Sequence, residues 1–138
     1  MQRRTFLIGA AGLIAAPAAA WAAGGWSPPV AVHFEPGLAE MNGRSWPELE
    51  AAHAAFKARP NPRNGDWVRV FGYMDEAERA QIMPELPLRR AKLIGEGFGF
   101  LNETPNIARP RAGSGLVVDV AGPSAANRVA LISWTVRT

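Results

Sequence analysis

The most informative run of this chain reads Val68-Arg69-Val70-Phe71-Gly72-Tyr73-Met74-Asp75, and Leu86-Pro87-Leu88-Arg89-Arg90-Ala91 follows it after a short interval. The first run is rich in β-branched and aromatic residues, which is typical of a strand, and it ends in a carboxylate. The second run has a proline suited to a helix start and carries two guanidinium groups. Together they predict an anion and a cation at neighbouring element ends. Such a pair suits a ligand with both an ammonium and a carboxylate, since each ionic hydrogen bond contributes about 1.5–3 kcal/mol.

The segment before this run predicts a strand followed by a helix. Residues 29–34 alternate between two faces, as expected for a first strand. Residues 45–58 predict a helix, in which Ser45-Trp46-Pro47-Glu48 fits a capping box with a proline among the first helical positions.

The segment after the run predicts one more helix and two more strands. Residues 76–85 indicate an irregular connection with at most one helical turn, in which Glu76 and Glu78 are solvated loop charges. Leu88, Ala91, Ile94 and Phe98 then follow at helical spacing. Ile107 starts a brief strand or bend, residues 116–120 are β-prone, and residues 129–136 close the sheet. The order β-α-β-α-β-β predicts an α+β two-layer sandwich, a mixed sheet with its helices on one face.

Two motifs in these runs resemble the OmpA-like domain family, whose members bind peptidoglycan. In that family a strand ends Gly-(His or Tyr)-Thr-Asp, and Leu-Ser-x-x-Arg-Ala opens the second helix. The matching residues are Gly72, Tyr73 and Asp75 for the first motif, and Leu86, Arg90 and Ala91 for the second. Residues 107–115 resemble the family's Ile-x-x-x-Gly-x-Gly stretch, and residues 126–132 its Asn-Arg-Arg-Val closing strand. The resemblance covers about residues 28–136.

This resemblance implies a non-catalytic module that recognises the diaminopimelate of the peptidoglycan stem peptide. It assigns the ligand's ammonium to Asp75 and its carboxylate to Arg90, with Tyr73, Asn127 and Arg128 as further ligand-binding residues. Free N–H groups at a helix start would assist a bound carboxylate. The alternative is a simple surface salt bridge between Asp75 and Arg90 with no ligand, worth about 0–1 kcal/mol.

The sequence also departs from the family pattern around these residues. Met74 replaces a threonine, Pro87 replaces the helix-opening serine, and Met83 replaces an asparagine. Glu76-Ala77-Glu78 stands where small polar and glycine residues are usual, and Arg128 is a single arginine where two are usual. A second hypothesis is therefore a protein-interaction or envelope-assembly module that keeps the fold without binding peptidoglycan.

Residues 1–22 predict an export signal, with a basic start, an apolar run over residues 6–20 and a cleavage site near Ala22-Ala23. The order Arg3-Arg4-Thr5-Phe6-Leu7 resembles a twin-arginine signal, and a general secretory signal or an uncleaved anchor are the alternatives. Residues 23–29 would form a tether, and residues 30–138 an OmpA-like domain. We expect a protein of the periplasm or cell envelope with no stable membrane span after signal cleavage.

Composition excludes several other classes of protein. The chain has no cysteine, so it has neither a disulfide nor a lipobox attachment site. Removing Arg3 and Arg4 from the 15 basic residues leaves 13 against 12 acidic residues, and no basic cluster indicates a nucleic-acid partner.

The sequence indicates neither a cofactor nor catalytic chemistry. His33 and His53 lie on different elements without a third ligand at a recognisable spacing, so we expect no metal. No nucleophile elbow or phosphate loop is present, and we predict that the protein is not an enzyme. A periplasmic enzyme or cofactor carrier remains a third hypothesis, motivated only by the twin-arginine pattern.

Overall fold

The computed structural model describes residues 25–101 and 106–136. The predicted signal peptide, residues 1–22, lies outside these residues. Part of the predicted tether is described, and it packs on the domain: Trp26 forms an isolated bridge with Thr135, and the backbone N–H of Ser27 donates to the Trp134 carbonyl at 2.7 Å.

Four strands form one mixed sheet in the order β1-β4-β2-β3. They are β1 (Val30–His33), β2 (Val68–Gly72), β3 (Arg111–Ala112) and β4 (Val129–Trp134). β4 runs antiparallel to both β1 and β2, whereas β2 and β3 are parallel. Every residue of β4 is buried, as expected for a central strand covered on both faces.

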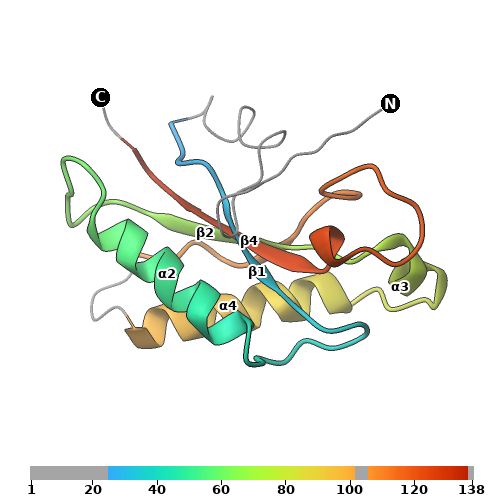
Figure 1. Cartoon of the computed structure of the whole chain (residues 1–138). Helices are drawn as coiled ribbons and strands as arrows, with labels where there is room; N and C mark the ends of the chain where they lie inside the picture. The colour runs from blue at the N-terminus through green and yellow to red at the C-terminus, as the bar shows by residue number, and fades with distance from the viewer. Residues whose placement is uncertain (1–24, 102–105, 137–138) are drawn as a thin grey trace.

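Two long helices, α2 (Ser45–Lys57) and α4 (Leu86–Leu101), lie on the same side of this sheet (Figure 1). A one-turn helix, α3 (Glu76–Ala80), connects β2 to α4, and a short 3-10 helix, η1 (Ala125–Asn127), precedes β4. The predicted α+β sandwich with a mixed sheet and helices on one face is therefore confirmed, as is the single helical turn after Asp75.

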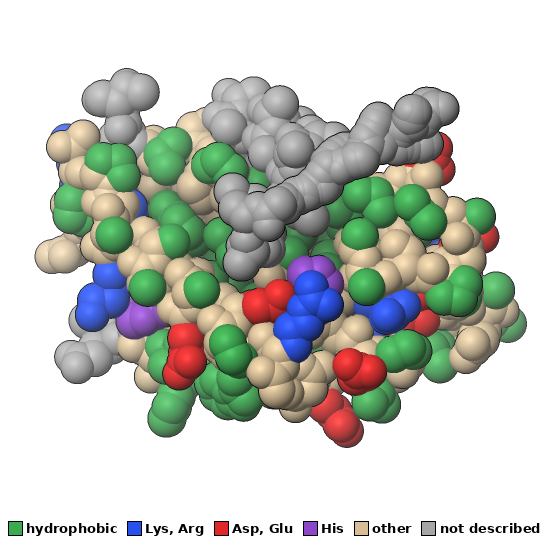
Figure 2. Space-filling model, in the orientation of Figure 1, with side chains coloured by type: hydrophobic (Ala, Val, Ile, Leu, Met, Phe, Trp, Pro, Cys, Tyr) green, Lys and Arg blue, Asp and Glu red, His purple; other side chains and the backbone are tan. Residues whose placement is uncertain are grey.

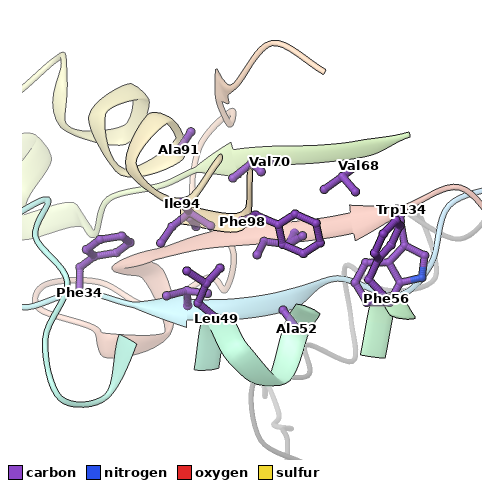
Figure 3. Packing of buried hydrophobic residues seen from close by; sticks show 13 residues of the cluster. Phe34, Leu49, Ala52, Phe56, Val68, Val70, Ala91, Ile94, Phe98 and Trp134 are labelled. Atoms are coloured by element: carbon purple, nitrogen blue, oxygen red, sulfur yellow. The ribbon is translucent and has the colours of Figure 1, made fainter. Parts of the chain in front are cut away.

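The main hydrophobic core lies between the sheet and these two helices (Figure 3). Phe56 of α2 packs edge-on against Phe98 of α4 and against Trp134 of β4, with ring centroids 5.4 and 5.8 Å apart. Val68 and Val70 point into this core from β2, as their alternation predicts. The opposite face of the sheet carries a smaller cluster centred on Ala31 and Leu131.

Gly72 fixes the distance between the end of β2 and the start of α4. A Cβ atom at this position would overlap the backbone carbonyl of Pro87, so the backbones of strand and helix approach as closely as only glycine allows. This contact sets the position of Asp75, three residues after Gly72, relative to Arg90, three residues after Pro87.

Three local predictions are wrong. Ser45 is the first residue of α2 rather than its cap: the Asn42 side chain accepts from Ser45 N, while Glu48 bonds to His33 of β1, so no capping box forms there. Residues 116–120 form no strand, because the backbone of Val118 bonds to the side chain of Asn127 instead of to a neighbouring strand. The closing strand also ends at Trp134 rather than at residue 136.

Candidate functional site

Asp75 lies where the chain leaves β2 and enters α3. Its backbone is extended (φ −83°, ψ 174°), and its side chain caps the helix by accepting from Glu78 N at 2.7 Å. In turn, the Oε1 atom of Glu78 accepts a hydrogen bond from Asp75 N at 2.9 Å. The reciprocal pair is a capping box, which satisfies two otherwise free N–H groups of the short helix.

The second oxygen of Asp75 faces the chain before β4. It accepts from Ser124 N at 3.0 Å and from Nη1 of Arg128 at 3.0 Å, and only 1% of the residue is exposed. Burial alone would raise the pKa of this carboxyl, but the hydrogen bonds from Glu78, Ser124 and Arg128 favour the charged form and bring the pKa below its ordinary value.

Arg90, on the first turns of α4, is fully buried. Its guanidinium binds the carboxylate of Glu78 at two points, with Nη1 to Oε1 at 2.9 Å and Nη2 to Oε2 at 2.6 Å. Two parallel N–H donors on one carboxylate make the bidentate geometry that guanidinium groups favour.

The other three N–H groups of Arg90 donate to backbone carbonyls. Nε donates to Leu38 at 3.0 Å, Nη1 to Tyr73 at 2.9 Å, and Nη2 to Glu35 at 3.2 Å. An arginine has five N–H donors, so every donor of Arg90 has a partner inside the protein.

Asp75, Glu78, Arg90 and Arg128 form one unit, which we name the four-charge cluster. Its two carboxylates and two guanidinium groups balance, and its ion pairs are Arg90 with Glu78 and Arg128 with Asp75. The fold thus brings the predicted Asp75, Arg90 and Arg128 together, with Glu78 bonded to both Asp75 and Arg90. The alternative of a surface salt bridge between Asp75 and Arg90 is wrong, because both residues are buried and each has another ionic partner.

Arg128 differs from Arg90 because only some of its N–H groups donate to acceptors among the described residues. Its Nη1 binds Asp75 and its Nε donates to the Phe34 carbonyl at 3.3 Å, and its side chain is 15% exposed. Three of its five N–H groups therefore have no acceptor within residues 25–101 and 106–136. A ligand carboxylate could use these donors.

Tyr73 and Asn127, the other predicted ligand-binding residues, have structural partners. The Tyr73 carbonyl accepts from Arg90, while its ring lies in the cluster on the far face of the sheet, where burial raises the pKa of the phenol. Asn127 is fully buried, and its amide exchanges two hydrogen bonds with the backbone of Val118, at 2.9 and 3.1 Å.

The loop after β1 covers the four-charge cluster. Gly37 N donates to Oε2 of Glu78 at 2.7 Å, and the Leu38 carbonyl binds Arg90. Gly37 and Leu38 also line a hollow of about 390 Å³ against α4, together with the exposed side chain of Arg89. The backbone that holds the cluster thus also forms the edge of an open hollow.

Glu78 is the central residue that sequence reasoning missed. It is 3% exposed, so its prediction as a solvated loop charge is wrong, whereas Glu76 is exposed as predicted. The pattern Asp75-Glu76-Ala77-Glu78 contains a capping residue and a glutamate three positions later, and that signal would have identified the helix start. It would not have revealed the contact between Glu78 and Arg90.

Three further observations concern metal binding, membrane-spanning helices and the distribution of surface charge. Within the described residues no group of three or more potential ligands could hold a metal ion, and no helix is both long and apolar enough to cross a membrane. Acidic and basic side chains are interspersed on the visible face of the molecule (Figure 2).

Comparison with known proteins finds similarity in structure alone. No family model matches the sequence, and a search of curated proteins finds no significant match. The crystal structure of the peptidoglycan-associated lipoprotein from Burkholderia pseudomallei is similar, with a TM-score of 0.56 and 16% identity over 76% of this chain and 89% of that one. The OmpA-like domain of FopA1 from Francisella tularensis is also similar, with a TM-score of 0.58 and 15% identity over 78% of this chain and 71% of that one. The chain therefore has the fold of these domains.

Proposed function

We propose that this protein is a non-catalytic, exported module that binds peptidoglycan in the cell envelope. The observation that supports the proposal most is the convergence of Asp75, Arg90 and Arg128 on one cluster, in a fold shared with a peptidoglycan-associated lipoprotein. The leader pattern of residues 1–22 supports export to the periplasm, with Arg3 and Arg4 favouring the twin-arginine route.

The proposed ligand is the diaminopimelate of the stem peptide. Its ammonium would bind the Asp75 carboxylate, which the low pKa keeps charged. Its carboxylate would bind guanidinium groups: Arg128 offers three N–H groups that have no acceptor within residues 25–101 and 106–136, and Arg90 offers its bidentate fork when Glu78 does not occupy it. Tyr73 and Asn127 would contribute by holding the surrounding backbone in place.

Sedimentation with insoluble sacculi tests this function. We expect the purified protein to sediment with sacculi and to be released by free meso-diaminopimelate, but not by cadaverine, which has two ammonium groups and no carboxylate. Arg128→Ala should weaken retention about tenfold through loss of a charge-assisted contact. Arg89→Ala, which removes an exposed arginine from the start of α4 next to Arg90, is the control and should leave retention unchanged. Retention that responds neither to diaminopimelate nor to Arg128→Ala contradicts the proposal.

A second candidate function is a protein-interaction or envelope-assembly module that has kept the fold without the ligand. One specific observation favours it: all five donors of Arg90 are already bonded within the protein. A folded protein that sacculi do not retain, but that co-purifies with an envelope protein after crosslinking, would support this second function.

A further inference from the structure

The carboxylate of Glu78 is held as a bound ligand carboxylate would be held. It accepts both arms of the Arg90 fork, together with the backbone N–H groups of Asp75 and Gly37 at 2.9 and 2.7 Å. A guanidinium fork and two converging N–H groups make a complete carboxylate site, because each oxygen receives two donors. In this chain the site is filled by a side chain of the protein itself.

The element that carries Glu78 has little else to hold it. α3 has five residues, and Glu78 is its only buried one. Apart from Glu78 and the local backbone turns, the hydrogen bonds that hold α3 within the described residues are the Asp75 cap and one from Gly122 N to Glu76. By contrast, α4 buries seven residues of its own, so Arg90 is fixed by the core. If the pair separates, α3 is the side that moves, since that movement exposes the least apolar surface.

We propose that Glu78 is an internal ligand of Arg90, occupying the position that a ligand's carboxylate takes in the proposed function, on which this inference rests. An external amino-acid ligand then engages Arg90 only in the fraction of molecules in which α3 has moved away. Its apparent affinity is reduced by that fraction, as for any site that is only partly open. Glu78 thereby sets how tightly the protein binds carboxylates.

Chemical rescue tests this assignment without peptidoglycan. Glu78→Ala removes the carboxylate and leaves a space beside Arg90, which acetate can enter. We expect the melting temperature of Glu78→Ala to rise by about 4 °C or more in acetate relative to chloride at equal ionic strength, in a saturable manner. If Glu78→Ala is unfolded in chloride, the readout becomes recovery of its circular dichroism signal on adding acetate.

Two matched variants separate the carboxylate site from general effects of salt and capping. Glu78→Gln keeps an oxygen for the Asp75 N–H but fills the space, so acetate should not stabilise it. The double variant Glu78→Ala with Arg90→Met keeps the space but removes the fork, and it too should give no response. Equal responses to acetate and chloride in Glu78→Ala, or an acetate response retained without Arg90, overturn the proposal.

Ligand binding gives the second readout. Glu78→Ala should bind free meso-diaminopimelate at least about tenfold more tightly than the unaltered protein, because the internal competitor is gone. The two ideas fail separately. If the unaltered protein binds sacculi but acetate does not rescue Glu78→Ala, the role of Glu78 is wrong and the proposed function stands. If acetate rescues the variant but sacculi retain neither protein, Glu78 fills a carboxylate site and peptidoglycan is not its ligand.

Discussion

The starts of α2 and α3 have similar sequences but different structures. Each has a short polar residue followed three positions later by a glutamate: Ser45 and Glu48 in α2, Asp75 and Glu78 in α3. At α3 the capping box forms, and Glu78 also binds the buried Arg90. At α2 no capping box forms, and Glu48 binds His33 of β1 and the half-exposed Arg44.

This difference shows that a local motif does not determine what its glutamate does. Both glutamates bind an arginine, but the Arg90 side chain is fully buried whereas that of Arg44 is 59% exposed. In the interior, a charge that loses its partner is not rehydrated, whereas near the surface water replaces the partner at small cost. We therefore expect the same substitution to have very different effects at the two helix starts.

The largest effect is expected for Arg90→Met. This change leaves the Glu78 carboxylate buried without its guanidinium, and three backbone carbonyls lose a donor. Breaking a buried ion pair from one side typically costs about 3–5 kcal/mol. Denaturant unfolding should show a loss of that size in the free energy of unfolding. A loss below about 1 kcal/mol would mean that burial does not strengthen the pair of Arg90 and Glu78, and burial would then not distinguish the two helix starts.

A smaller effect, which depends on pH, is expected for Asp75→Asn. In the folded protein the pKa of Asp75 lies below its ordinary value. Its stabilising contribution is therefore fully present at a pH above the ordinary pKa of an aspartate, and it is lost as the pH falls through the folded-state pKa. At pH 7 the substitution should cost about 1.5–3 kcal/mol, the worth of hydrogen bonds to a charged group. The difference between the two proteins should shrink as the pH is lowered toward 3. A cost that is equal at both pH values contradicts a charged Asp75 in the cluster.

Much of the fold follows from patterns that are local in the sequence. The alternation of Val68 and Val70 predicts the core face of β2, and the spacing of Ala91, Ile94 and Phe98 predicts the core face of α4. These predictions succeed because burial of a periodic face depends on one dominant force, the removal of apolar surface from water.

The polar contacts are harder to predict, because several partners compete for each group. Ser45 does not cap α2, because its own N–H and that of Arg44 donate to the side chain of Asn42. The β-prone residues around Val118 are taken out of the sheet by the Asn127 amide. Glu78 meets Arg90 across twelve positions, and no local pattern encodes that contact. The motif resemblance identified Asp75, Arg90 and Arg128, but not Glu78, which bonds to both Asp75 and Arg90.

At α2 we expect a moderate effect from Glu48→Gln. The Glu48 carboxylate accepts from His33 N at 2.9 Å and contacts His33 Nδ1 at 2.8 Å. Burial alone would raise its pKa, but the contacts with His33 outweigh that effect and lower it, so the carboxylate is charged at neutral pH. A glutamine retains the oxygen but loses the charge, which should cost about 1 kcal/mol in the free energy of unfolding. Denaturant unfolding of the two proteins at pH 7 measures this cost, and a cost near zero would mean that the charge of the Glu48 carboxylate does not contribute.

The smallest effect is expected for Arg44→Met, the counterpart of Arg90→Met at the other helix start. Nε of Arg44 lies 3.2 Å from Oε2 of Glu48, a single contact between residues four positions apart on an exposed face. Such pairs contribute about 0.3–0.5 kcal/mol, and salt screens them. Glu48 also keeps both of its contacts with His33 when Arg44 is removed. Denaturant unfolding in low and high salt should therefore give a small loss that disappears at high ionic strength. A loss that persists in salt, or that approaches that of Arg90→Met, would show that the α2 pair is as protected from water as the four-charge cluster, and burial would then not distinguish the two helix starts.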